Sequence, residues 1–167
     1  SDVYKRQRQH TNPRNGRHCT GRLEVKTLGH FFQTDIATIS IPSCRDHDFE
    51  PWRSALYALI EASSELLEIN RDDLNGTIAI WQDRPTMVLY DTVPGGAGIS
   101  QKIFEHMPEV AAAALKRVQQ CSCGIDTSCY QCLRSYSNQR YHEELRREDA
   151  INLLSELVLS LIHISEP

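Results

Sequence analysis

Apolar residues recur along this chain with two periods, one typical of strands and one typical of helices. Residues 77–82 and 86–91 are short strand patterns, and the three residues between them predict an antiparallel hairpin. Residues 23–41 are rich in β-branched and aromatic side chains, which predicts one long strand or two strands joined near Gly29. Alternate residues of this pattern are expected on opposite faces: Phe32, Thr34, Ile36 and Thr38 on one, and Phe31, Ala37, Ile39 and Ile41 on the other.

Three further segments carry apolar residues at intervals of three and four, which predicts amphipathic helices. The first covers residues 52–69, with Pro51 in the first helical position. The second begins near Ile99 and is expected to break or kink at Pro108, and the last covers residues 147–158. The predicted fold is α/β (α+β), with a small mixed or antiparallel sheet and three to four helices.

The two ends of the chain do not resemble protein-coding sequence. Residues 1–7 (SDVYKRQ) and 159–167 (LSLIHISEP) are similar to in-frame translations of the two transposase adapters used in sequencing libraries. Ordinary termini are the alternative, but each match stands at the correct end. We therefore expect residues 8–158 to be the native domain and an internal piece of a longer gene.

The charge balance limits the classes of partner. The chain carries a net charge of −4, so it is not a general binder of nucleic acid, and contact with DNA would require a local basic patch. No stretch approaches the length of a membrane span, and no secretory signal is visible. Clustered cysteines fit metal binding in a reducing cytoplasm better than scattered disulfides do, so we expect a cytoplasmic protein without membrane contact.

Four of the six cysteines lie within residues 121–132, spaced C-x-C-x5-C-x2-C. Two close pairs across a short loop can bring four thiolates around one zinc ion, and four thiolates leave no open position for water. We predict one structural zinc per chain, with no catalytic role. Two disulfides and a C-x-x-C redox motif are the alternatives, although the βαβ context of the redox motif is absent. The predicted ligands are Cys121, Cys123, Cys129 and Cys132.

The other two cysteines stand apart from this cluster. Cys44 lies in a polar loop and is interpreted as a lone thiol. Cys19 follows His18 and could remain from a second, upstream metal site, although a free thiol is favoured. His142 lies ten residues beyond Cys132 and is interpreted as a surface or hydrogen-bonding histidine.

A glycine-rich loop, residues 91–98 (DTVPGGAG), leaves a predicted strand and enters a predicted helix. The glycines Gly95, Gly96 and Gly98 allow close approach of the backbone, and amides at a helix N-terminus can hold a phosphate, such as one of DNA. The loop is neither a Walker A motif nor a dinucleotide fingerprint. The alternative is a tight turn packed against the zinc module.

Basic and aromatic residues alternate around the cysteines. Arginines can pair with phosphates and tyrosines can stack on bases, while the alternative is a solvated face whose tyrosines cover the zinc site. No arrangement of nucleophile and base is legible, so no catalytic residue is assigned. The residues of this patch are Lys116, Arg117, Tyr130, Arg134, Tyr136, Arg140, Tyr141, Arg146 and Arg147, of which Arg134, Tyr136, Arg140 and Tyr141 are the candidates for nucleic-acid binding.

Four sequence blocks together resemble one known family. Residues 28–39, 52–78, 89–98 (LYDTVPGGAG) and 121–142 are similar, in this order, to the MrfA-like zinc-binding domain. That domain is found at the C-terminal end of superfamily 2 DEAD/DEAH-type DNA helicases, and in proteins that accompany helicases in bacterial anti-phage systems. The resemblance implies that the four cysteines bind zinc.

The resemblance also implies a parent that uses ATP to move along or unwind DNA. This domain would then pack on RecA-like motor domains in cis, or on a helicase in trans, and help to engage DNA. Residues 8–158 contain neither a P-loop nor a DEAH-type box, so ATP is expected only in motor domains outside this chain.

Residues 133–140 depart from the better-known form of the family, so a DNA-repair parent and a defence parent both fit. One alternative function is an interaction module of a helicase-associated protein in anti-phage defence. A second is a nucleic-acid-processing enzyme that uses Asp91 and the glycine-rich loop.

Overall fold

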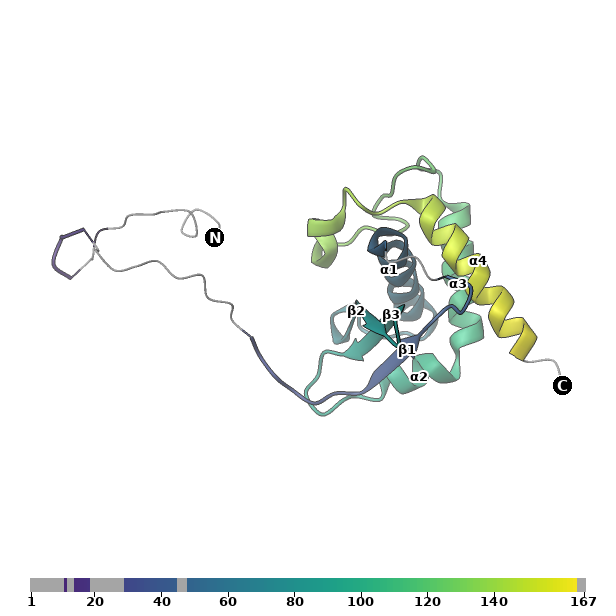
Figure 1. Ribbon diagram of the computed structural model, residues 1–167, viewed down its shortest axis with the longest axis horizontal. Helices are drawn as coiled ribbons and strands as arrows, with labels where there is room; N and C mark the ends of the chain where they lie inside the picture. The colour runs from purple at the N-terminus through teal and green to yellow at the C-terminus, as the bar shows by residue number, and fades with distance from the viewer. Residues whose placement is uncertain (1–10, 12–13, 19–28, 45–47, 165–167) are drawn as a thin grey trace. The chain divides into compact units, whose positions relative to one another are not determined.

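The computed structural model describes residue 11 and residues 14–18, 29–44 and 48–164. These residues fall into two compact units that divide after Phe31. In the first unit, Thr11 and His18 form an isolated antiparallel bridge. The second unit contains the helices and strands named below (Figure 1). Cys19, the candidate for a second metal site, lies outside the described residues.

Three strands form one sheet in the second unit, in the order β1-β3-β2. β1 (Ile36–Ile39) and β2 (Leu74–Trp81) both pair antiparallel with the central strand β3 (Arg84–Asp91). The predicted hairpin is therefore confirmed, and its turn consists of Gln82 and Asp83, with φ of 49° and 60°. Positive φ at both central residues is what a type I′ turn requires, and this turn matches the twist of the two strands.

β1 is much shorter than the strand predicted over residues 23–41. Residues 29–35 form no strand, and residues 23–28 lie outside the described part. The chain before β1 runs instead beside the loop that follows β3, since the carbonyl oxygen of Gln33 accepts a hydrogen bond from the amide of Gly95 at 2.8 Å. Its polar groups are thus satisfied by a loop rather than by a neighbouring strand.

The two faces of β1 differ as the alternation predicts. Ala37 and Ile39 are buried, whereas Ile36 is 60% exposed and Thr38 is exposed. Phe31 was predicted on the same side as Ala37 and Ile39, but it is exposed, because the regular alternation does not extend back beyond β1.

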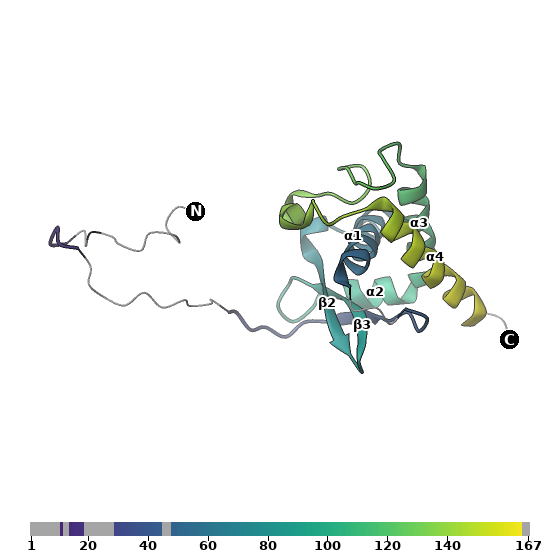
Figure 2. The ribbon, with the colours of Figure 1, turned by 45° about the horizontal axis from the view of Figure 1, so that its top comes forward.

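One helix lies at the centre of the fold. α1 (Phe49–Leu66) lies between the sheet and two further helices, α3 (Met107–Gln120) and α4 (Arg147–Ile164) (Figures 1 and 2). α1 begins before Pro51 because the side chain of Asp48 caps it, accepting a hydrogen bond from the amide of Glu50 at 3.1 Å. Burial on several sides explains why ten of its residues are inaccessible: Trp52, Ser54, Ala55, Leu56, Tyr57, Ala58, Leu59, Ile60, Ala62 and Ser63.

The segment between α1 and the hairpin is more regular than the predicted turn. Residues 70–76 were expected to form a turn, but a short 3-10 helix, η2 (Arg71–Asp73), leads directly into β2. Gly76 lies in β2 against α1, where a Cβ atom would come within 2.8 Å of Leu56 Cδ1 and 3.1 Å of the Val88 carbonyl oxygen. The missing side chain therefore permits the close packing of α1 on the sheet.

The predicted break near Pro108 is confirmed. α2 (Ile99–Glu105) ends at His106, and Pro108 lies in the first turn of α3, where its missing N–H has no helical acceptor to lose. Phe104 was expected on the apolar side of this helix, but it is 69% exposed.

α4 continues beyond its predicted end at Val158. Leu157 is buried and Leu161 packs against the edge of the core, which explains the added turns. The adapter origin of residues 159–167 stays a prediction. None of the helices in the described part of the chain is long and apolar enough to cross a membrane. The fold is thus the predicted α+β domain, with an antiparallel sheet.

Candidate metal centre

The four clustered cysteines lie in residues 121–132, a segment called the knuckle from here on. Cys121 is the residue that caps the C-terminus of α3, so the helix fixes its position. Cys129 and Cys132 belong to a tight turn, in which the Cys129 carbonyl oxygen accepts hydrogen bonds from the amides of Cys132 and the next two residues at 3.1, 3.1 and 3.0 Å. A helix end and a closed turn thus present the two cysteine pairs to each other.

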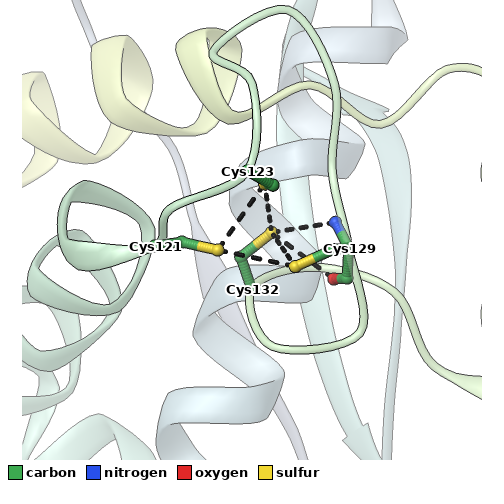
Figure 3. Close-up of side chains that lie close together, drawn as sticks. All are labelled: Cys121, Cys123, Cys129 and Cys132. Atoms are coloured by element: carbon green, nitrogen blue, oxygen red, sulfur yellow. Dashed lines mark hydrogen bonds between the residues drawn. The ribbon is translucent and has the colours of Figure 1, made fainter.

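The four sulfur atoms converge on one point (Figure 3). Neighbouring sulfurs are 3.5 Å apart for Cys121–Cys123 and Cys121–Cys129, 3.7 Å for Cys123–Cys132, and 3.8 Å for Cys129–Cys132. A zinc ion with four Zn–S bonds of about 2.3 Å would set tetrahedral edges of about 3.8 Å. All four cysteines are free thiols, so the structure contains neither disulfide of the alternative interpretation, and its sulfur set fits zinc.

The thiols differ in their electrostatic surroundings. The backbone N–H of Cys123 lowers the pKa of the Cys121 thiol to about 7. Burial raises the pKa of Cys123 and of Cys132, which is completely inaccessible. Zinc binds the thiolate form, so the lowered pKa of Cys121 favours zinc binding at this sulfur.

Arginines that the sequence predicts on a basic surface instead stabilise the knuckle. Arg117 donates from Nε to the carbonyl oxygen of Cys132 at 3.1 Å. Arg134 donates from Nε to Ser128 Oγ at 3.0 Å, and from Nη2 to a backbone oxygen beyond the knuckle. A nucleic-acid contact by Arg134 would therefore have to replace these internal hydrogen bonds.

Arg147 departs furthest from its predicted surface position, since it is 7% exposed. Its Nε donates to the Val118 carbonyl oxygen at 2.9 Å and its Nη2 to that of Gln119 at 3.4 Å, while Nη1 donates to the carbonyl oxygen of Cys123. One feature of the sequence could have indicated the buried position of Arg147. It is the first residue of a helix, where a positive charge is unfavourable because it lies at the positive end of the helix dipole.

The tyrosine- and arginine-rich segment forms a second 3-10 helix, η3 (Tyr136–Tyr141). Tyr136 is 84% exposed, and Arg140 is exposed with its guanidinium 4.6 Å from the centre of the Tyr141 ring. Tyr141 itself is half-buried, and the guanidinium of Arg53 lies 4.6 Å from the same ring. Of the predicted nucleic-acid residues, Tyr136 and Arg140 are thus the accessible ones in this segment.

His142 follows η3 and has the hydrogen-bonding role predicted for it. Its Nε2 lies 2.9 Å from Asn138 Oδ1 and 3.1 Å from the Ser135 carbonyl oxygen. Tyr130 of the knuckle packs edge-on against the imidazole, with ring centres 5.5 Å apart. His142 therefore links η3 to the knuckle without joining the sulfur set.

The glycine-rich loop is organised around Asp91, which is completely buried. Its carboxylate accepts hydrogen bonds from the amides of Ala97 at 2.7 Å, Ile99 at 3.0 Å and Ser100 at 2.8 Å, and from Ser100 Oγ. Burial alone would raise the pKa of Asp91, but these hydrogen bonds hold it below the ordinary carboxyl value. A carboxylate enclosed in this way has no exposed surface to offer a nucleic-acid substrate.

Two glycine amides of the loop are also engaged. Gly95 donates to the Gln33 carbonyl oxygen at 2.8 Å and Gly96 to that of Val93 at 3.0 Å. A phosphate would have to displace these bonds, and nucleic-acid binding by Gly95, Gly96 and Gly98 stays a prediction. Gly96 has a φ of 80°, and a Cβ atom there would lie 2.2 Å from Asp35 Oδ2, so this position favours glycine.

The loop and η3 approach each other through η2 rather than through the knuckle. Thr92 donates from its amide to the carbonyl oxygen of Asp73 at 2.9 Å, and Arg71 donates from Nη2 to Ser137 Oγ at 3.4 Å. None of the hydrogen bonds described for residues 91–98 reaches the knuckle, and packing of the loop against the zinc module stays a prediction.

Comparison with known proteins agrees with this geometry. Residues 55–133, from within α1 to just past the last knuckle cysteine, match the family model of the MrfA Zn-binding domain. This part of the chain is therefore similar to the MrfA Zn-binding domain. The family model ends just after the fourth sulfur and includes the glycine-rich loop, so both features belong to this domain.

Solved structures resemble the MrfA-like domain in fold. The crystal structure of the DUF1998 helicase MrfA bound to DNA is 21% identical, with a TM-score of 0.55, over 73% of this chain and 17% of that chain. The crystal structure of MrfA bound to DNA and AMPPNP is 17% identical, with a TM-score of 0.59, over 88% of this chain and 19% of that chain.

Curated proteins are also similar to the MrfA-like domain. Druantia protein DruE of Escherichia coli (strain UMEA 4076-1) is 27% identical, over 86% of this chain and 9% of its own length. The uncharacterized protein MJ1572.1 of Methanocaldococcus jannaschii is 24% identical, over 47% of this chain and 69% of its own length. The chain thus spans less than a tenth of DruE.

Proposed function

We propose that this domain is the zinc-binding accessory domain of an ATP-dependent DNA helicase in the cytoplasm, and that its zinc is structural. The observation that carries the proposal is the set of four convergent sulfurs within a segment that matches the MrfA Zn-binding domain. ATP would be bound and hydrolysed in RecA-like motor domains, in cis or in a helicase in trans. The domain would pack on the motor and help to engage DNA.

In this proposal, Cys121, Cys123, Cys129 and Cys132 hold one zinc ion per chain. Bound zinc would supply four strong bonds that close the knuckle and would leave no site for water. The chain itself contributes the end of α3, the Cys129–Cys132 turn, and the arginines that donate to knuckle carbonyls. The knuckle then acts as a fixed link between α3, η3 and α4.

The proposed DNA contact lies on η3. Tyr136 offers an exposed ring for stacking on a base, and Arg140 offers an exposed guanidinium for a phosphate. The chain carries a net charge of −4, so we expect the contact to be weak in this domain alone and to add to that of a motor.

The DNA contact is tested by the binding of a fluorescent single-stranded oligonucleotide to the chain at low salt. Tyr136→Ala and Arg140→Gln should each weaken binding. Lys116→Gln is the matched control, because it also removes one exposed positive charge but lies on α3. Equal losses in Arg140→Gln and Lys116→Gln would leave only nonspecific charge, and would contradict a site on η3.

The similarity to Druantia protein DruE favours a second candidate, a module of a helicase-associated protein in an anti-phage defence system. The two candidates differ in their genes. A RecA-like motor encoded upstream in the same reading frame supports the accessory domain in cis. A separate helicase gene beside a frame without motor motifs supports the defence partner, and sequencing of the flanking DNA distinguishes them.

A further inference from the structure

Arg147 is a buried positive charge for which the described residues supply no matching negative charge. Its side chain is almost inaccessible, and its three donor contacts all go to backbone carbonyls. Arg53, Arg71 and Arg117 each pair with a glutamate, whereas no carboxylate of the described residues pairs with Arg147. Buried charges are ordinarily paired, because removing a cation from water is costly unless an anion lies beside it.

The hydrogen-bond acceptors of Arg147 place its charge beside the knuckle. One of its acceptors is the carbonyl oxygen of Cys123, and the other two, on Val118 and Gln119, belong to the last turn of α3. Cys121 caps the same helix end. The knuckle sulfurs therefore lie at the negative end of a helix dipole, a place that disfavours further negative charge.

Four thiolates and one zinc ion would carry a net charge of −2 at this position, four times −1 plus 2. We infer that Arg147 is the positioning residue and counter-charge of the zinc–thiolate centre, since it donates both to a knuckle carbonyl and to the last turn of α3. This inference rests on the zinc centre of the proposed function. It assigns Arg147 a role that appears only when the thiolates are ionised, in addition to its hydrogen bonds to the backbone.

Arg117 provides the contrast within the same knuckle. It too donates to the carbonyl oxygen of a cysteine, Cys132, at 3.1 Å. Its charge, however, is already paired with Glu65, whose side chain is 66% exposed. Arg117 thus matches Arg147 in stabilising a knuckle carbonyl but differs from it in having its own anion.

The experiment measures zinc affinity of the full chain by competition with a chromophoric chelator. Arg147→Gln keeps hydrogen-bond donors but removes the charge, and we expect affinity to fall about 10–100-fold, as for other residues that support metal ligands. Arg147→Lys keeps the charge and should retain most of the affinity. Arg117→Gln should change it far less than Arg147→Gln.

A second measurement separates the counter-charge from simple packing. In the zinc-loaded chain, Arg147→Gln should lower the melting temperature, whereas in chelator-treated chain the loss should be smaller, because the neutral thiols no longer need a cation. Equal losses in both forms, or equal losses of affinity in Arg147→Gln and Arg117→Gln, would overturn the inference. If Arg147→Gln does not fold, Arg147→Lys decides: near-normal affinity supports the charge, and a loss of tens of fold contradicts it.

Zinc binding by the wild-type chain distinguishes a failure of the proposed zinc centre from a failure of the role inferred for Arg147. If it binds no zinc, the metal centre itself is contradicted. If it binds zinc and Arg147→Gln binds it equally well, only the role of Arg147 is contradicted.

Discussion

The glycine-rich loop and the knuckle each surround a centre of negative charge, but with different partners. Each is a short, irregular segment at the end of a helix, and each gathers its groups around a centre of negative charge. In the loop, the centre is the carboxylate of Asp91, and the chain's own amides surround it. In the knuckle, the centre is four sulfurs that need a cation from outside.

The difference concerns what each segment needs in order to stay folded. Asp91 accepts four hydrogen bonds from neighbours within nine residues, so the loop is complete without any ligand. The knuckle has a preformed turn and a helix end, but its four sulfurs would repel one another as thiolates without a cation between them. We therefore expect zinc removal to loosen the knuckle and to leave the loop intact.

The largest expected effect is the loss of zinc from the knuckle. Cys132→Ser removes a completely buried sulfur, and the bound zinc should fall from one per chain to almost none. Zinc binding in small domains contributes on the order of 10 kcal/mol, so the knuckle should lose its fixed structure. Metal content and hydrogen exchange of residues 121–132 are the measurements. Cys44→Ser is the matched control, and equal zinc loss in it would contradict the assignment.

The glycine-rich loop should lose stability when the charge of Asp91 is removed. Asp91→Asn removes the charge that accepts the amides of Ala97, Ile99 and Ser100, and places an NH2 group among these donors. We expect a loss of about 3 kcal/mol in the free energy of unfolding, measured by urea denaturation. Zinc content should stay at the wild-type value. Asp83→Asn, in the exposed hairpin turn, is the control, and zinc loss in Asp91→Asn would show that the two regions are coupled after all.

A smaller effect is expected at Gly96. Gly96→Ala places a Cβ atom at a φ of 80° and against the Asp35 carboxylate, which is exposed and can move away. The backbone strain should then dominate, at about 1–2 kcal/mol. Gly29→Ala, where a Cβ atom meets nothing within 4 Å, should have almost no effect. If Asp35→Ala restored full stability to Gly96→Ala, the clash rather than the backbone would be the cause.

The smallest expected effect is the pH dependence of the loop. The pKa of Asp91 is lower in the folded state than its ordinary value, so the unfolded chain binds a proton more readily. The stability that Asp91 contributes is therefore complete above the ordinary carboxyl pKa and is lost as the pH falls through the lowered value. Urea midpoints of wild type and Asp91→Asn should converge as the pH falls. A constant difference between them at every pH would contradict the lowered pKa.

The sequence alone predicted the elements whose periodicity is local. The hairpin, the break near Pro108 and the buried face of α1 follow from patterns of a few residues, and the structure confirms them. The cysteine spacing likewise predicted the convergence of four sulfurs, because all four lie within residues 121–132. Residues 23–41 misled the prediction, since aromatic and β-branched residues suit a strand whether or not a partner strand extends beside them.

What only the tertiary structure decided is the use of charge. From sequence, Arg134 and Arg147 read as surface cations and Asp91 as a candidate for chemistry, because the pattern of a charge run does not reveal what covers it. The fold buries Asp91 under the start of α2 and brings Arg147, the first residue of α4, to the far end of α3. These contacts join residues in different elements, and the free energy of a buried charge depends on such neighbours. The sequence determined where the four cysteines gather, and the tertiary structure determined which residues stabilise that cluster.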